Sequence, residues 1–338
     1  MSITFRILGK AGRDNAMLVQ IDSGQAVERL LFDCGDGCLS EMALAEIWGI
    51  DQLLFSHLHM DHIGGFDAFF RGHFESNSEI NKPNHIWGPP DTARILQHRF
   101  QGFLWNLYEE MAATWLVSEI HPSEIRTVRF ELGEAFARAH DAGVQRYDRI
   151  FFERAGFVVE SVAMDHRTTS LAYVIREKTR RNVNLSRLTA LGLRPGPWLK
   201  QLKESTSASG NVVIDGFEHS MAEMRTTLIE ETPGEAVAYL TDFLLDEAAM
   251  ERLVPALRGC RTIVCEGKFR HADLELAQKN YHMTTVLAAT LAQRAGVEEL
   301  ILFHLSDRYR QEDWLEMLAE AKQIFPNTRY PSEWNLGQ

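Results

Sequence analysis

The hydrophobic positions in the first sixty residues come in short runs that are interrupted by turn-forming residues. Runs at residues 3–8, 17–21 and 29–32 are separated by Gly, Asp and Ser, which is the pattern of short strands joined by tight turns. A helical spacing follows over residues 38–48, and the apolar run at residues 53–55 predicts a further strand. The N-terminal region is therefore predicted to form a sheet.

The C-terminal part of the chain alternates regularly between apolar runs and helical patterns. Strands are predicted at residues 236–240, 262–265 and 300–303, and helices at residues 246–257, 284–295 and 311–324. Four further strands are predicted at residues 125–130, 150–153, 158–163 and 170–175. This alternation predicts an α/β protein whose sheets are covered by helices. Because no internal repeat or linker interrupts the pattern, residues 1–338 are predicted to be one domain with insertions.

Residues 89–117 combine a helical spacing with many aromatic side chains, among them Phe100, Trp105 and Trp115. An aromatic stripe at that spacing is typical of a packed core or a hydrophobic lid. The segment is therefore predicted to be helical.

The composition is that of an ordinary globular chain. Of its 338 residues, 45% are hydrophobic and 24% are charged, which excludes a disordered, collagen-like or coiled-coil protein. No apolar run approaches the ~18 residues that cross a bilayer, and the first residues lack the features of a signal peptide. The four cysteines lack C-x-x-C spacing and do not suggest a disulfide framework. We therefore expect a cytoplasmic protein that does not enter membranes.

The charge of the chain is unevenly distributed. The net charge is −12, which argues against non-specific binding to nucleic acids. Residues 176–203, however, hold eight basic residues and one acidic residue, so that this segment carries +7 and the rest of the chain −19. Such a run is most often a solvated face, but in an acidic protein it is also where a polyanion would bind. Together with Pro195, Gly196 and Pro197, it predicts a basic arm over about residues 176–215.

The predicted strand at residues 53–55 leads directly into the segment Ser56-His57-Leu58-His59-Met60-Asp61-His62. This segment holds four metal-capable side chains in six residues, and imidazole and carboxylate groups together suit borderline divalent ions. In an extended turn His57 and His59 point the same way, whereas Asp61 and His62 can turn toward a second position. The pattern predicts a site for two metal ions at the carboxyl end of a strand.

The segment HLHMDHIGG, preceded by FDCGDG, resembles the metallo-β-lactamase superfamily, and later segments resemble its ribonuclease Z branch, which processes tRNA 3′ ends. These later segments are DHRTTSLAY with His166, YLTD with Asp242, EGKF with Glu266, HMT with His282, HLSDRY with His304, and the pair Gly196-Pro197 in the basic arm. The resemblance implies an αββα sandwich, with two mixed sheets packed face to face between helices. The segment at approximately residues 90–147 has no counterpart in the family. It is predicted to be an insertion that could narrow or reroute the access of substrate to the site.

The resemblance also implies which residues hold the metals. The first ion would be held by His57, His59 and His166, the second by Asp61, His62 and His304, and Asp242 would bridge them. Each ion would then have three protein ligands and the shared carboxylate, which leaves a position for water. Zinc is the expected metal, with manganese or iron as alternatives.

Further roles follow from the same resemblance. Asp61, His282 and Glu266 are the expected catalytic residues. His282 would protonate the leaving 3′ oxygen, and Glu266 would orient the imidazole of His282. Ser306 and Arg308 would hold the scissile phosphate, and Gly196 and Pro197 would contact the substrate. The ordinary structural alternatives are a neighbour of a helix N-cap for His282, a buried ion pair for Glu266 and a surface salt bridge for Arg308.

Three functions fit these observations. The first is a two-metal phosphodiesterase that cleaves tRNA precursors at the 3′ end, with the basic arm binding phosphates and a homodimer as one form of assembly. The second is a hydrolase of a small substrate on the same scaffold, such as an aryl sulfate, a lactone or a cyclic phosphodiester, which the aromatic segment favours. The third, an inactive binding protein, is disfavoured because all seven candidate ligands are present.

Overall fold

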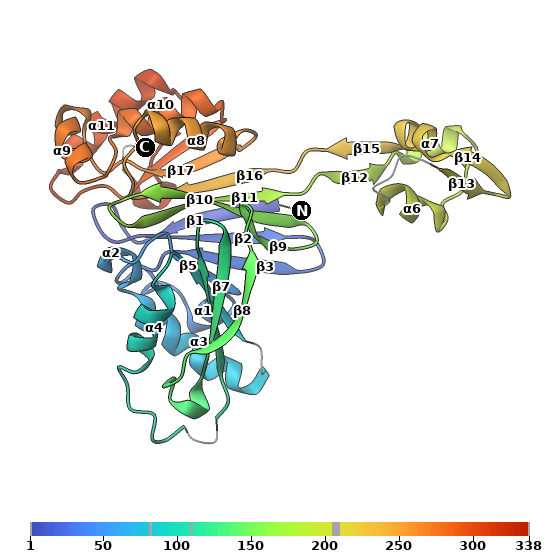
Figure 1. The fold of residues 1–338 in the computed structure, drawn as a ribbon. Helices are drawn as coiled ribbons and strands as arrows, with labels where there is room; N and C mark the ends of the chain where they lie inside the picture. Colours follow the sequence, from blue (N-terminus) through green and yellow to red (C-terminus); the bar gives the residue numbers. More distant parts are fainter. Residues whose placement is uncertain (1, 81–82, 109–110, 205–209, 337–338) are drawn as a thin grey trace. The chain divides into compact units, whose positions relative to one another are not determined.

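The computed structural model describes residues 2–80, 83–108, 111–204 and 210–336. Two compact units are present, one formed by residues 1–176 with 235–338 and the other by residues 177–234. We call the first the body and the second the inserted unit (Figure 1). Within the described residues, every helix is too short or too polar to span a membrane.

The first sheet of the body has eight strands in the order of the sequence, β1 to β8. The strands β3 to β6 are parallel, whereas β1, β2, β7 and β8 pair with their neighbours in antiparallel fashion. Parallel strands require crossover connections, which the helices α1 to α4 supply. The elements are β1 (Ser2–Leu8), β2 (Ala16–Asp22), β3 (Val27–Phe32), α1 (Leu44–Trp48), β4 (Gln52–Leu54), α2 (Met60–Ile63), α3 (Phe66–Ile80), β5 (Asn84–Gly88), α4 (Thr92–Phe100), β6 (Thr114–Ile120), β7 (Glu124–Glu131) and β8 (His140–Arg146).

The second sheet has seven strands in the order β19-β18-β17-β16-β11-β10-β9. The strands β16 to β19 are parallel, and helices connect them in the order predicted for the C-terminal part of the chain. The elements are β9 (Ile150–Glu153), β10 (Phe157–Asp165), β11 (Thr169–Glu177), β16 (Ala236–Leu240), α8 (Glu247–Leu257), β17 (Thr262–Glu266), α9 (Leu274–Lys279), α10 (Thr285–Ala295), β18 (Glu299–Phe303), α11 (Gln311–Ile324) and β19 (Thr328–Arg329).

Three apolar layers hold the body together. One layer lies between the first sheet and its helices, another lies between the second sheet and α8, α10 and α11, and the third joins the two sheets. In the third layer the ring of Phe32 lies 5.3 Å from that of Tyr173 and 5.7 Å from that of Tyr239. The body is therefore an αββα sandwich, which confirms the predicted fold class.

Two predicted helices are shorter than the sequence pattern indicated. The helix predicted at residues 89–117 ends at Phe100, and residues Thr114–Ile120 form the strand β6 instead. Gly102 follows the end of the helix, and the aromatic and β-branched residues of β6 favour a strand that buries Trp115. The helix predicted at residues 38–48 begins only at Leu44, because residues 36–41 form turns. About residues 90–147, predicted to be an insertion, contain three strands of the first sheet.

The inserted unit has a small core of its own. Helices pack around a hairpin and a second strand pair, and the buried side chains include Leu188, Trp198, Leu202 and Leu228. The elements are β12 (Arg180–Val183), α5 (Leu185–Ala190), α6 (Trp198–Glu204), β13 (Asn211–Ile214), β14 (Phe217–Ser220), α7 (Met221–Leu228) and β15 (Ile229–Thr232). The predicted basic arm at about residues 176–215 covers only the first part of this unit.

The net charge of the inserted unit differs from that of the basic segment at residues 176–203, all of which except Arg176 belongs to this unit. Residues 177–234 contain eight basic and seven acidic residues, a net charge of +1. Acidic residues of β15 lie beside β12, where Arg181 Nε donates to Glu231 Oε1 at 2.8 Å and Asn184 Nδ2 donates to Glu230 Oε1 at 2.6 Å. The chain that follows the basic segment thus neutralises most of its charge.

Candidate metal centre and active site

A tight turn after β4 presents the first four candidate ligands. Ser56 begins this turn, and its backbone N–H and its hydroxyl donate to the two carboxylate oxygens of Asp33, each at 2.7 Å. His59 is the N-cap of α2 and has extended backbone angles, so that Asp61 and His62 lie in a helical turn while His57 and His59 precede it. This change of backbone conformation directs the two pairs of side chains to different positions, as the sequence pattern predicted.

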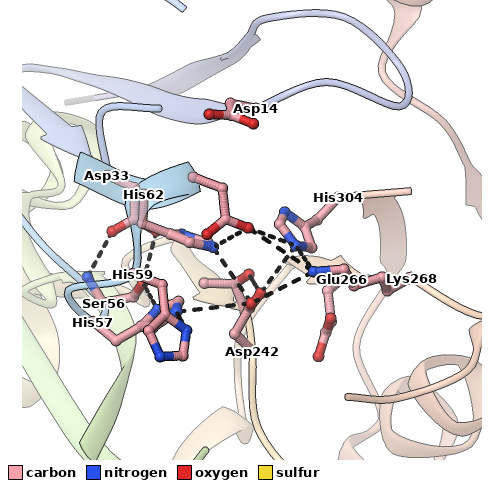
Figure 2. A network of polar contacts seen from close by, with 12 residues as sticks. Asp14, Asp33, Ser56, His57, His59, His62, Asp242, Glu266, Lys268 and His304 are labelled. Atoms are coloured by element: carbon pink, nitrogen blue, oxygen red, sulfur yellow. Dashed lines mark hydrogen bonds and ion pairs between the residues drawn. The ribbon is translucent and has the colours of Figure 1, made fainter. Parts of the chain in front are cut away.

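The buried carboxylate of Asp33 organises this part of the site. Its Oδ2 atom lies 2.8 Å from His62 Nδ1 and accepts a hydrogen bond of 2.9 Å from the Tyr239 hydroxyl. One ring nitrogen of His62 is thereby held, and the other nitrogen, Nε2, faces Asp61 and Asp242 (Figure 2). A carboxylate that orients an imidazole through its outer nitrogen is typical of metal-binding histidines.

The second sheet supplies its candidate residues singly, from the ends of different strands. His166 follows β10, Asp242 lies two residues beyond β16, and His304 directly follows β18. The parallel register of β16, β17 and β18 brings their carboxyl ends to one edge. Asp242 and His304 have φ angles of 51° and 52°, a region that residues with side chains seldom adopt and that is common at functional sites.

These contributions form two groups of candidate ligands. The ligand atoms of His57, His59 and His166 all lie within 4.8 Å of one another. The same limit holds for a second group, which consists of Asp61, His62, Asp242 and His304. The fold thus brings together the seven residues that the family resemblance implied as ligands, and Asp242, implied as a bridge, belongs to the second group.

Asp242 lies between the two groups. Its Oδ2 atom is 3.8 Å from His57 Nε2, 3.7 Å from His166 Nε2 and 3.4 Å from His62 Nε2. Its other oxygen, Oδ1, is 3.3 Å from His304 Nε2. Figure 2 shows the imidazoles of His57 and His62 on one side of this carboxylate and His304 on the other. The histidines outweigh the effect of burial, which alone would raise the pKa of Asp242, and hold it well below its ordinary value.

The donor set fits divalent metal ions. The separations around Asp242 exceed the ~2.7–3.2 Å of an N–H···O hydrogen bond, and they match the roughly 3.4 Å between two ligands that bind one tetrahedral zinc ion. Among the described residues, buried His62 Nε2 also has no hydrogen-bond partner. A buried nitrogen without a hydrogen-bond partner, between two carboxylates, is a position that a bound metal ion would satisfy.

His282 forms a third group with His166 and Asp242, whose ligand atoms also lie within 4.8 Å of one another, and it pairs with Glu266. His282 Nδ1 lies 2.9 Å from Glu266 Oε2, and both side chains are buried. His282 Nδ1 is also 3.7 Å from Asp242 Oδ2. Burial acts to lower the pKa of His282, but Glu266 and Asp242 outweigh it and raise the pKa above its ordinary value. The pair therefore favours an imidazolium beside the candidate metal ligands.

The predicted substrate-binding residues have different surroundings. Ser306 lies in the loop after β18, where its backbone N–H donates a hydrogen bond of 3.3 Å to the carbonyl oxygen of Lys268. Arg308 is exposed, and its guanidinium lies 5.7 Å from the ring centre of Phe269, whose ring adjoins that of His282. Gly196 and Pro197 belong to the inserted unit, where they immediately precede α6.

Three residues near the ligands were not predicted from the sequence as site residues. They are Asp33, Tyr239 and Lys268, whose Nζ atom lies 2.9 Å from His304 Nε2. Asp33 could have been predicted from the sequence, because it directly follows an apolar strand and belongs to the FDCGDG segment. Tyr239 and Lys268 follow only from the packing of the two sheets and the pairing of β17 with β18.

Comparison with known proteins decides the family. A ribonuclease Z from Deinococcus radiodurans is 47% identical to this chain over 331 residues, which cover 98% of each protein. The chain belongs to the ribonuclease Z family. It is a metal-dependent hydrolase with the metallo-β-lactamase fold. A second ribonuclease Z, from Brevibacillus brevis, is 29% identical over 97% of this chain and 94% of its own length.

Other comparisons support the fold of this ribonuclease Z family member. The structure of human tRNase Z, short form, matches with a TM-score of 0.52 and 16% identity over 91% of this chain and 94% of the other. The metallo-β-lactamase fold protein YhfI from Bacillus subtilis matches with a TM-score of 0.55 and 15% identity over 97% of this chain and 95% of the other. A family profile described as Anti-Pycsar protein Apyc1 matches residues 9–140.

Proposed function

We propose that this member of the ribonuclease Z family cleaves tRNA precursors at the 3′ end as a two-metal phosphodiesterase. The observation that carries the proposal is the arrangement of two ligand groups around the single carboxylate of Asp242. The 47% identity to a ribonuclease Z over nearly the whole chain supports the same activity.

In this proposal the seven candidate ligands bind two metal ions. His57, His59 and His166 would hold one ion, Asp61, His62 and His304 would hold the other, and Asp242 lies within reach of both groups. We propose zinc as the metal, with manganese or iron as alternatives, because the set is rich in imidazole and contains few carboxylates. When bound, a pair of such ions polarises a phosphoryl oxygen and lowers the pKa of water.

The buried pair of His282 and Glu266 provides a proton for the leaving group. In this proposal His282 donates a proton to the leaving 3′ oxygen, and Glu266 holds the imidazole through Nδ1 at 2.9 Å. Glu266 and Asp242 outweigh burial and raise the pKa of His282, which favours the protonated imidazole that a general acid requires. Ser306 and Arg308, in the loop after β18, contact the phosphate.

We propose the inserted unit as the arm that binds the RNA outside the active site. Arg187, Arg194, Lys200 and Lys203 are exposed there, in the part of the unit that precedes α6 and along α6 itself. Exposed arginines and lysines bind phosphates without reading sequence. The family resemblance also implies a homodimer, which sedimentation of the purified protein would test. The four free, buried cysteines support action in the reducing cytoplasm.

The test uses two substrates with the same purified, metal-loaded protein. One substrate is a tRNA precursor with a 3′ extension, and the other is bis-p-nitrophenyl phosphate. We expect cleavage of both, with the RNA cut once at the 3′ end. Cleavage of the small ester alone would contradict the proposal and favour a hydrolase of small substrates.

A further inference from the structure

Lys268 is held in the active site by its backbone. It lies two residues beyond the end of β17, after Gly267, whose N–H donates to Phe303 O at 2.9 Å. A Cβ atom at Gly267 would lie 2.8 Å from Thr285 Cγ2, so that only glycine allows this close approach. The carbonyl oxygen of Lys268 accepts a hydrogen bond of 3.3 Å from Ser306 N–H. The backbone is therefore fixed on both sides of the lysine.

The Lys268 side chain extends into the second group of candidate metal ligands. Its Nζ atom lies 2.9 Å from His304 Nε2, 3.9 Å from Asp61 Oδ2 and 4.0 Å from Asp242 Oδ2 (Figure 2). Only 22% of the side chain is exposed. A lysine ammonium donates hydrogen bonds and accepts none, so His304 Nε2 is the acceptor.

A metal ion and the Lys268 ammonium have opposing demands on this site. The ion requires the lone pair of His304 Nε2, which the ammonium engages in this structure. An ion held by His304 and the Lys268 ammonium would also repel each other, because both are cations, and partial burial reduces the screening by water. Lysine has a long, flexible stem, so the ammonium can leave His304 while the fixed backbone keeps it beside the ligands.

We propose that Lys268 is a further substrate-binding residue, whose ammonium leaves His304 when the second ion binds and then contacts a non-bridging oxygen of the scissile phosphate. This inference rests on the proposed phosphodiesterase function. Two consequences follow together, because the same positive charge opposes the second ion and attracts the phosphate. Removal of that charge should strengthen the binding of the second ion and weaken catalysis on phosphodiesters.

The experiment replaces Lys268 with Met, which keeps the length of the side chain and removes its charge. The first measurement is zinc affinity by competition with a chelator, in which Lys268→Met should bind the second ion roughly tenfold more tightly than the parent. The second is hydrolysis of bis-p-nitrophenyl phosphate at saturating zinc, in which kcat/KM should fall roughly 10- to 100-fold. Lys268→Arg should keep most of the activity, and Lys322→Met, at an exposed position of α11, is the matched control.

Each outcome has one meaning. Unchanged or weaker affinity for the second ion in Lys268→Met would overturn the inference, and so would unchanged kcat/KM at saturating zinc. If Lys268→Met does not fold, as judged by its thermal unfolding, Lys268→Gln takes its place. A parent protein that binds no ions or cleaves no phosphodiester would instead contradict the proposed function itself.

Discussion

The two sheets of the body contribute to the same site in different ways. The first sheet supplies four candidate ligands from the single turn after β4, within six consecutive residues. The second sheet supplies His166, Asp242 and His304 from the ends of three strands, which are separated by many residues in the sequence. The four neighbouring ligands after β4 can supply part of an ion's coordination by themselves. His166, Asp242 and His304 come together only in the folded protein. We therefore expect substitutions in this second set to have the larger effects.

The largest effect is expected for Asp242→Ala, because this carboxylate lies between both ligand groups. The parent should hold about two divalent ions per chain and the variant fewer than one, with little activity left. Metal analysis after dialysis checks this. Asp246→Ala is the matched control, since Asp246 caps α8 through Ala249 N–H at 2.8 Å and should cost only about 1 kcal/mol of stability. Equal metal contents in parent and Asp242→Ala would break the comparison.

The next largest effect is expected for His282→Ala, which removes the proposed general acid and leaves the metal ligands in place. Turnover of a tRNA precursor should fall by roughly 10²–10⁴ while the metal content stays constant. An ester with a p-nitrophenolate leaving group needs no proton and should lose much less activity. His271→Ala, at a partly buried histidine that contacts Thr284, is the control. Equal losses on both substrates would show a structural role for His282.

A smaller effect is expected for Asp33→Asn, which removes the carboxylate that holds the turn with the four candidate ligands after β4. The carboxylate holds Ser56, His62 and Tyr239, and loss of its charge should weaken metal binding by roughly 10- to 100-fold. Tyr239→Phe removes only one of these hydrogen bonds and should cost about 1 kcal/mol of stability. Chelator competition and denaturant unfolding measure the two quantities. Unaltered metal affinity in Asp33→Asn would mean that the turn after β4 keeps its conformation without the Asp33 carboxylate.

The smallest effect on the chemistry is expected outside both sheets, in the inserted unit. Replacement of Arg187, Arg194 and Lys203 by Ser should weaken RNA binding and leave hydrolysis of bis-p-nitrophenyl phosphate unchanged. Each lost phosphate contact should reduce the slope of log K against log salt by ~0.7–0.9. Arg181→Ser is the control, because Arg181 already pairs with Glu231. An unchanged salt slope in the triple variant would contradict the proposed arm.

The same difference between the sheets decides what could be predicted from the sequence. The histidine cluster after β4 is visible as a local pattern, whereas His166, Asp242 and His304 were predicted only because short segments resemble a known family. Periodicity predicted most strands and the C-terminal helices correctly. It was wrong after Phe100: residues 101–108 form turns and irregular chain, and residues 114–117 lie in β6 between β5 and β7. The aromatic and β-branched residues of β6 favour a strand, and the helical spacing of the aromatic residues hid this preference.

Charge gives a second example of this limit. The sequence indicated a segment of +7 between residues 176 and 203, yet the folded inserted unit carries +1. The pairing of β12 with β15 brings Glu230 and Glu231 beside Asn184 and Arg181. A run of charge along the chain therefore overstates the charge of the surface when a later strand with opposite charge pairs with it.

The sequence by itself determined the α/β fold class and the cluster of four candidate metal ligands after β4, because these depend on local patterns of residue types along the chain. The resemblance of its segments to a known family added the other three candidates. Only the tertiary structure decided that Asp242 lies between two ligand groups, that Asp33 supports His62, and that Lys268 contacts His304. These relations depend on the packing of two sheets and on the register of β17 with β18. Such contacts join residues far apart in the chain, and no local pattern encodes them.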